Sequence, residues 1–191
     1  QQEGQDKQHA RITISSYLQM FKDLFLFEDL TGWEPPLRSK KRVRIAPKRY
    51  FVDPSLPSSI LGANPNALLR DMQTLGGLFE TLCLRDIRVY LSALSGATNA
   101  VYYYRDENGL EVDFIIELSD GRWGAIEAKL SDEKVDDDSA GKLAAFKRKI
   151  TKNPKAQVRE PSFLALIVGK GGFAYRRDDG ILVIPLACLE A

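Results

Sequence analysis

The stretch EVDFIIELSDGRWGAIEAK, from Glu111 to Lys129, predicts a β-hairpin and decides the fold. Two mostly apolar runs flank Ser119-Asp120-Gly121. A three-residue loop that ends on a glycine in the left-handed conformation is a favoured way to close a hairpin. This closure pairs Leu118 with Arg122 and fixes which residues of the two strands lie opposite each other.

The same register brings three charged side chains together. Counting back from the loop places Asp113 opposite Glu127, with Cβ atoms about 4.5–5.5 Å apart. Lys129 shares the face of Glu127, because side chains two residues apart lie on the same side of a strand. Two carboxylates this close repel each other unless a proton or a cation lies between them. A divalent ion suits oxygen ligands, and the alternative is a cross-strand ion cluster that only fixes the register.

A third carboxylate precedes the hairpin on a long helical stretch, residues 67–96. Glu80 continues an apolar stripe formed by Leu84, Ile87 and Leu91, at spacings that put all four on one helix face. That face is expected to cover the sheet, which would bring Glu80 toward the hairpin. Alternatively, Glu80 pairs with an arginine of its own helix or lies at the edge. The glycine pair at 76–77 predicts a break in this helix, and Gly96 predicts its end.

The order of elements predicts an α/β domain with a mixed sheet flanked by helices. Strands are expected at 100–105, 110–117 and 122–130, an amphipathic helix at 140–150, and two apolar strands at 163–169 and 180–186. A turn at Glu107-Asn108-Gly109 places Tyr103 opposite Asp113. That tyrosine either packs in the core or offers a surface for base stacking.

The N-terminal third of the chain predicts a separate small unit. Residues 1–10 are polar and are expected to form an unfolded leader or a cut end. A helix starting at Thr13 or Ser15, a short strand at 26–30 and a hairpin around Pro47 outline a winged-helix-like α+β segment over residues 11–64. The proline-rich loop at 53–66 separates it from the second domain, residues 65–191.

Basic residues cluster in this first unit, although the whole chain carries a net charge of only +1. Such a cluster can lie along a phosphate backbone, so nucleic-acid contact is one interpretation. The other is a solvated edge strand that lysine protects from aggregation, or a surface that meets another domain. The candidate nucleic-acid-binding residues are Arg38, Lys40, Lys41, Arg42, Arg44, Lys48 and Arg49. Lys142 and its basic neighbours on the 140–150 helix present the same ambiguity.

The sequence resembles a known superfamily in the segments GGLFETLCLRDIRVYL, VYYYRDENGLEVDFII and WGAIEAKLS. A helix Glu, a strand Asp and an E-x-K on the next strand resemble the PD-(D/E)XK nuclease pattern. More narrowly, YLQMFKDLFLF, APKRYFVDPSL and these segments are similar to the C-terminal domain of unknown function of prokaryotic AAA+-type ATP-binding proteins. The resemblance extends over roughly residues 12–129.

The resemblance implies a restriction-endonuclease-like fold and a Mg²⁺ site. Glu80, Asp113 and Glu127 would be metal ligands, and Lys129 would be catalytic together with Asp113 and Glu127. The implied activity is DNA endonuclease cleavage, in which the metal activates a water. The alternative is a non-catalytic module that binds nucleic acid or protein for the ATPase. The implied partners are DNA and the N-terminal ATPase domain of a longer protein.

The composition gives a coarse expectation of location. No apolar run approaches the roughly 18 residues of a membrane-spanning helix, and no signal peptide precedes the fold. The two cysteines lie far apart, without the spacing of a metal site. We therefore expect a cytoplasmic protein that has no contact with a membrane.

Overall fold

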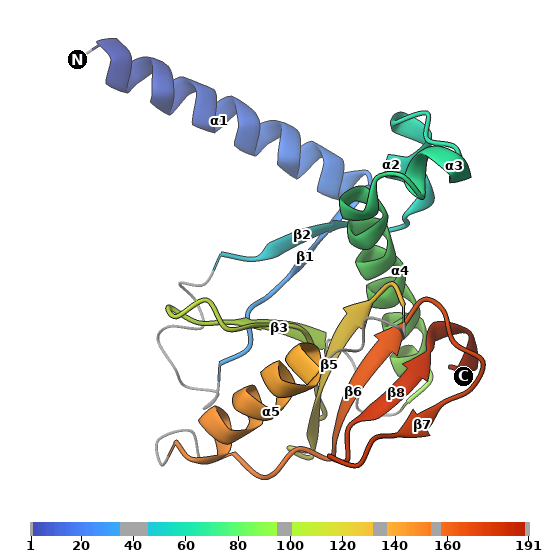
Figure 1. Ribbon diagram of the computed structural model, residues 1–191. Coiled ribbons are helices and arrows are strands. Elements are labelled where there is room, and N and C mark those ends of the chain that lie inside the picture. Colours follow the sequence, from blue (N-terminus) through green and yellow to red (C-terminus); the bar gives the residue numbers. More distant parts are fainter. Residues whose placement is uncertain (1, 35–45, 95–100, 132–136, 154–157, 190–191) are drawn as a thin grey trace.

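The computed structural model describes residues 2–34, 46–94, 101–131, 137–153 and 158–189. Its body is a six-stranded sheet with the order β3-β4-β5-β6-β8-β7 (Figure 1). The first three strands are antiparallel neighbours, β5, β6 and β8 run parallel, and β7 pairs antiparallel with β8. The mixed α/β class is therefore confirmed. The strands are β3 (Val101–Arg105), β4 (Glu111–Glu117), β5 (Trp123–Lys129), β6 (Phe163–Val168), β7 (Tyr175–Arg176) and β8 (Leu182–Pro185).

The hairpin register predicted from the loop is confirmed. The β4–β5 ladder runs from Glu117–Trp123 to Phe114–Ile126, and Leu118 N–H donates to the Arg122 carbonyl at 2.8 Å. Gly121 has a φ of 81°, the left-handed conformation that the loop requires.

A β-bulge in β4 changes which face Asp113 occupies. Tyr102 pairs with Ile115 and Tyr104 with Val112, so Tyr103 alone faces two residues of β4. Val112 packs on the α5 side of the sheet, whereas Phe114 packs on the α4 side. The alternation of faces is therefore interrupted at the bulge. The hairpin loop carries no signal of this irregularity.

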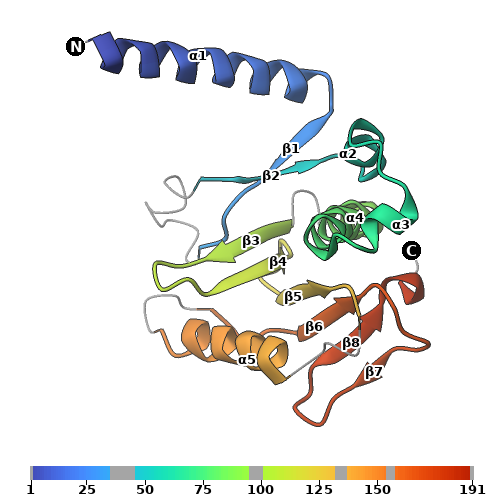
Figure 2. The same cartoon turned by 45° about the horizontal axis from the view of Figure 1, so that its top comes forward.

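Two helices cover opposite faces of the sheet (Figures 1 and 2). Helix α4 (Met72–Ser92) buries Cys83, Leu84 and Ile87 against one face. Helix α5 (Asp137–Thr151) buries Leu143, Phe146 and Ile150 against the other. In the second core layer, the Phe146 ring contacts Trp33, Tyr104 and Trp123, with ring centroids 4.7–6.1 Å apart.

Helix α4 corrects two sequence-based expectations. It runs unbroken through Gly76 and Gly77. The predicted helical stretch is interrupted earlier, between the end of α3 (Pro65–Leu68) and Met72. Asp71 provides the start, because its side chain accepts a hydrogen bond from Thr74 N–H at 3.0 Å. The helix ends at Ser92, and the predicted stop at Gly96 lies outside the described residues.

The N-terminal unit is a small α+β segment whose details differ from expectation. Helix α1 spans Gln2–Asp23, so residues 2–10 are helical rather than an unfolded leader. The glutamine, glutamate, lysine and alanine residues of this leader are good helix formers. Helix α1 extends away from the sheet (Figures 1 and 2).

The basic strand after Pro47 pairs with a strand from earlier in the N-terminal unit. Strand β2 (Lys48–Phe51) pairs antiparallel with β1 (Phe27–Leu30), and the first half of the hairpin predicted around Pro47 lies outside the described residues. Leu30 and Tyr50 stabilise this pairing, because both side chains are buried against α4 and β4. Helix α2 (Ser55–Ile60) and α3 complete the segment. In the described residues, no helix is long and apolar enough to cross a membrane.

Candidate functional site

Asp113 lies where the β4–β5 ladder ends. Its Oδ2 accepts a hydrogen bond from the Ala128 backbone N–H at 3.0 Å, just beyond the last ladder pair, Phe114–Ile126. Burial, followed by the charges of Glu127 and Glu80, raises the pKa of the Asp113 carboxyl to about 7, against the lowering effect of the Ala128 N–H and Lys48. A strand residue thus presents a carboxyl group that changes its charge near neutral pH.

Glu127 is the most buried of the charged site residues, with 2% of its surface exposed. Its Oε1 accepts from Lys129 Nζ at 3.1 Å and from Lys142 Nζ at 2.6 Å. Its Oε2 is buried without a hydrogen-bond partner among the described residues. Burying a charged group in this way is costly without compensation, so the two ammonium groups stabilise the carboxylate and one oxygen is left over.

Lys48 connects Asp113 to two further carboxylates. Its Nζ lies 2.5 Å from Glu111 Oε1, 3.3 Å from Glu80 Oε1 and 3.9 Å from Asp113 Oδ1. Burial alone would lower the pKa of this lysine, but the surrounding carboxylates outweigh burial and raise it. The ammonium also lies 5.5 Å from the centre of the Tyr103 ring. Lys48 is therefore a charged, half-buried member of the site.

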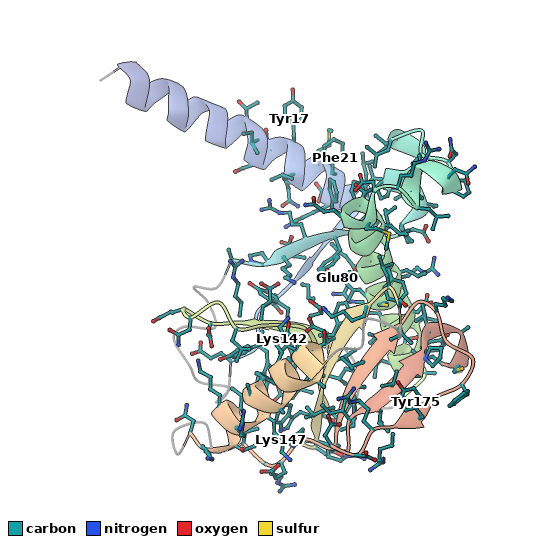
Figure 3. The ribbon with its side chains drawn as sticks, viewed as in Figure 1. Tyr17, Phe21, Glu80, Lys142, Lys147 and Tyr175 are labelled. Carbon is teal, nitrogen blue, oxygen red and sulfur yellow. The ribbon has the colours of Figure 1, made fainter. Side chains whose placement is uncertain are left out.

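Glu80 faces this cluster from α4, as predicted from the helix stripe. Its Oε1 accepts hydrogen bonds from the Tyr50 hydroxyl and from Lys48. Burial and the Glu80 charge raise the pKa of Tyr50 far above its ordinary value, so the hydroxyl keeps its proton and remains a donor. Figure 3 shows Glu80 on α4 and Lys142 on α5, so charged groups reach the sheet from both of its faces.

The three predicted metal ligands do not surround one point in this structure. Among the described residues, no group of three Asp, Glu, His or Cys side chains is close enough to hold a metal ion. Asp113 interacts electrostatically with both Glu80 and Glu127, but Lys48 lies between it and Glu80. Four carboxylates and three ammonium groups instead form a nearly neutral network, made of Glu80, Glu111, Asp113, Glu127, Lys48, Lys129 and Lys142.

Of the predicted nucleic-acid-binding residues, only Lys48 and Arg49 lie in the part of the chain that the structure describes. Arg38, Lys40, Lys41, Arg42 and Arg44 lie outside the described residues. Lys48 faces the carboxylates of the site, and its assignment to nucleic-acid contact stays a prediction. Arg49 is half-exposed and lies 3.5 Å from Asp29.

Lys48, Glu111 and Lys142 belong to the site, but sequence reasoning did not place them there. Lys142 was predictable in principle: α5 connects the parallel strands β5 and β6, so its first turns return near the end of β5 that carries Glu127. Glu111 lies two residues before Asp113. Lys48 gave no signal, since its approach depends on how the N-terminal unit packs on the sheet.

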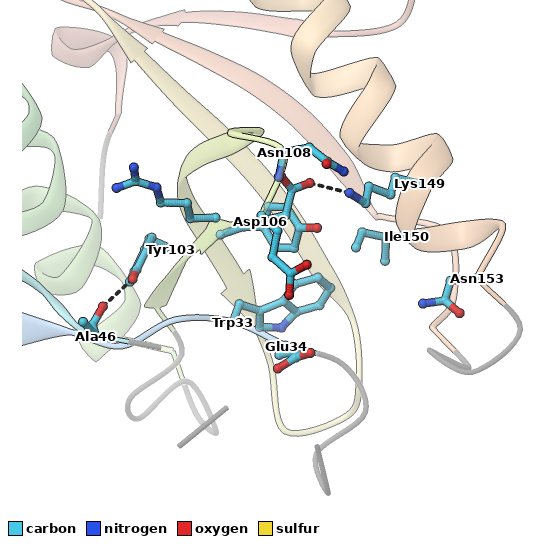
Figure 4. A pocket seen from close by; sticks show the side chains of 12 residues that line it. Trp33, Glu34, Ala46, Tyr103, Asp106, Asn108, Lys149, Ile150 and Asn153 are labelled. Atoms are coloured by element: carbon cyan, nitrogen blue, oxygen red, sulfur yellow. Dashed lines mark hydrogen bonds and ion pairs between the residues drawn. The ribbon is translucent and has the colours of Figure 1, made fainter. Parts of the chain in front are cut away.

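A separate cavity of about 510 Å³ lies beside the site (Figure 4). Trp33, Tyr103 and Tyr104 contribute aromatic walls, and the Asp106–Lys149 ion pair contributes a polar one. Tyr103 lines both regions, which agrees with the predicted position of this residue beside Asp113. None of the four site carboxylates lines the cavity.

These features define a mixed α/β domain with a buried carboxylate–lysine network where β4 and β5 part, preceded by a small α+β segment. The chain belongs to the family described as "Domain of unknown function (DUF4143)", whose model matches residues 75–189. A second family model, "Domain of unknown function (DUF8612)", matches residues 3–67.

The chain is similar to longer uncharacterized proteins. Proteins of Mycobacterium bovis and Mycobacterium tuberculosis are each 30% identical over 115 residues, which cover 60% of this chain and 24% of each relative. The matched region is thus about a quarter of those proteins.

One solved structure has a distant likeness to the chain. It is described as a refined half-complex from a tetradecameric assembly of Thermococcus gammatolerans McrB AAA+ hexamers with bound McrC. The match covers 57% of this chain and 27% of that chain, with 12% identity and a TM-score of 0.35. A likeness at this level does not define a function.

Proposed function

We propose that this domain is a restriction-endonuclease-like, Mg²⁺-dependent DNA endonuclease module of a longer AAA+-type ATPase. The observation that carries the proposal is the position of Asp113 and Glu127 on either side of the point where β4 and β5 part, with Lys129 on Glu127. The PD-(D/E)XK pattern requires these residue types on these two strands. The link to an ATPase rests on the sequence resemblance.

The donor atoms are of the chemical type that binds a hard divalent ion, although the three carboxylates do not converge on one point in this structure. Carboxylate oxygens are the ligands that Mg²⁺ prefers, and Glu127 Oε2 is a buried oxygen that has no hydrogen-bond partner in the described part of the chain. Asp113 and Glu127 would hold the ion, with Glu80 as the third ligand. When bound, Mg²⁺ supplies Lewis-acid activation of a water and of the phosphodiester.

The chain's own residues have distinct roles in this proposal. The Lys129 side chain is flexible and one-third exposed, and its ammonium group contacts Glu127 Oε1. An ammonium group in this position can turn toward a phosphate and stabilise the charge that develops there. Lys142 remains on Glu127 and offsets part of its negative charge.

A second candidate function is a non-catalytic module that binds nucleic acid or protein for the ATPase. The observation in its favour is that Lys48, Lys129 and Lys142 already neutralise most of the carboxylate charge without a metal. The basic strip with Arg38–Arg44 and Arg49 would be its contact surface. The winged-helix-like interpretation of residues 11–64 stays a prediction, because only one helix precedes the two strands in the described residues.

Cleavage of nicked, branched and single-stranded DNA in Mg²⁺ or Mn²⁺ distinguishes the two functions. The nuclease proposal expects cleavage that Lys129→Ala and Asp113→Asn each abolish. Lys147→Ala is the matched control, since Lys147 lies on α5 and pairs with Glu160 outside the site. DNA binding without cleavage, unchanged in Lys129→Ala, would favour the non-catalytic module.

A further inference from the structure

We propose that Lys48 is a tethered cation that takes the place of a divalent ion between Glu80 and Asp113. The N-terminal unit would thereby set the metal affinity of a site that the second domain otherwise builds. This inference rests on the proposed function, because it concerns the regulation of the same carboxylates. What it adds is that the Lys48 ammonium group, a part of the chain itself, competes with the metal ion.

The position of the ammonium group carries the inference. Lys48 Nζ lies 3.3 Å from Glu80 Oε1 and 3.9 Å from Asp113 Oδ1, the two carboxylates that it separates. A Mg²⁺ ion binds oxygen at about 2.0–2.1 Å, so an ion shared by these two groups would have to lie close to where Nζ lies now. Both cations cannot occupy that space, and their like charges repel each other.

The carboxylates that hold Lys48 are arranged by several elements. Glu80 is on α4, Glu111 and Asp113 are on β4, and the Tyr50 hydroxyl donates to the same Glu80 oxygen that faces Lys48. Lys48 and Tyr50 point the same way because they are two residues apart on β2. The N-terminal unit therefore provides a cation and a neutral donor to one point of the second domain.

The lysine can leave without unfolding the segment that carries it. The backbone of β2 is held by its pairing with β1 and by the buried Tyr50, while 24% of the Lys48 side chain is exposed. Lysine has a flexible four-carbon stem, so rotation of the side chain toward solvent would free the carboxylates. The contact then works as a competition between two cations, and its outcome depends on metal concentration.

Mn²⁺ titration of the intact chain, followed by electron paramagnetic resonance, tests the inference without relying on activity. We expect Lys48→Gln to bind Mn²⁺ at least about tenfold more tightly than the wild type, or about 1.4 kcal/mol. Lys48→Arg, which keeps the charge, should stay within about threefold of the wild type, allowing for its different shape. Arg49→Gln is the matched control on the same strand, because its arginine pairs with Asp29 and not with the site.

Thermal unfolding provides a second measurement for each variant. A ligand that binds only the folded state raises the melting temperature, so Mn²⁺ should stabilise Lys48→Gln more than the wild type. Equal or weaker Mn²⁺ binding by folded Lys48→Gln would overturn the inference and leave the proposed metal site standing. Absence of binding in both proteins, with each folded, would overturn the proposed metal site and the inference together.

Discussion

The Asp113 side chain accepts a hydrogen bond from the Ala128 N–H at 3.0 Å, in place of a backbone carbonyl of β4. The carboxyl group is thereby fixed at the point where the two strands part, with charged groups on both sides. One side holds Lys48 and Glu80, and the other holds Glu127 and its two lysines.

Asp113 predicts a specific pH dependence of stability. Its pKa is raised from 3.8 to about 7 in the folded protein, so between these values the folded state binds more protons than the unfolded state. Stability from this group is present below about pH 4 and is lost as pH rises toward 7. We expect up to about 4 kcal/mol of this loss to disappear in Asp113→Asn. Urea unfolding with EDTA at several pH values measures it, and parallel pH profiles for the two proteins would contradict it.

Lys142 is predicted to matter for stability because Glu127 is buried. Lys142→Gln leaves that carboxylate with one ammonium partner, and we expect a loss of about 1–3 kcal/mol in the free energy of unfolding. Lys147→Gln, on the same helix, breaks only the exposed pair with Glu160 and should cost less than about 1 kcal/mol. Chemical denaturation compares the two variants. Equal losses in the free energy of unfolding would show that the Lys142–Glu127 contact stabilises the fold no more than an exposed ion pair does.

The aromatic cluster on the α5 side predicts a large packing effect. Phe146 is fully buried against Trp33, Tyr104 and Trp123, so Phe146→Ala should destabilise the fold by about 3–5 kcal/mol. Phe173→Ala is the control, since 70% of that residue is exposed. Similar midpoints of unfolding for both variants would mean that α5 does not pack on the sheet as described.

Alanine substitution is expected to change stability in opposite directions at Gly121 and Gly77. Gly121 has a positive φ in the hairpin loop, so Gly121→Ala should destabilise by about 1 kcal/mol or more. Gly77 lies inside α4, where an added Cβ meets no atom within 4 Å, so Gly77→Ala should stabilise by about 0.5–1 kcal/mol. Thermal unfolding shows the signs, and a stabilising Gly121→Ala would refute the proposed loop conformation.

Much of the fold followed from local signals in the sequence. The loop at Gly121 gave the register of β4 and β5, and the stripe through Leu84 and Ile87 gave the buried face of α4. The β-bulge opposite Tyr103 did not follow, because the irregularity arises from three-dimensional packing of the strand pair and not from a turn residue. Without it, Asp113 was expected on the face of Glu127.

The members of the site divide in the same way. Glu80, Asp113, Glu127 and Lys129 could be named from residue types and spacing alone. Lys48 could not, because it comes from a strand whose pairing with β1 was not predicted, and its charge was interpreted as part of a surface strip. Residues that join a site through packing between distant segments leave no periodic pattern in the sequence.

Calorimetric titration of Mg²⁺ and Mn²⁺ into the protein, with Asp113→Asn alongside, shows whether the carboxylates where β4 and β5 part bind a metal ion. We expect binding by the wild type, with Mn²⁺ and Mg²⁺ competing for one site, and loss of that binding in the folded variant. Absence of binding in the wild type, or equal binding by Asp113→Asn, would contradict a metal site that includes Asp113. The carboxylate–lysine network would then be a structural ion cluster.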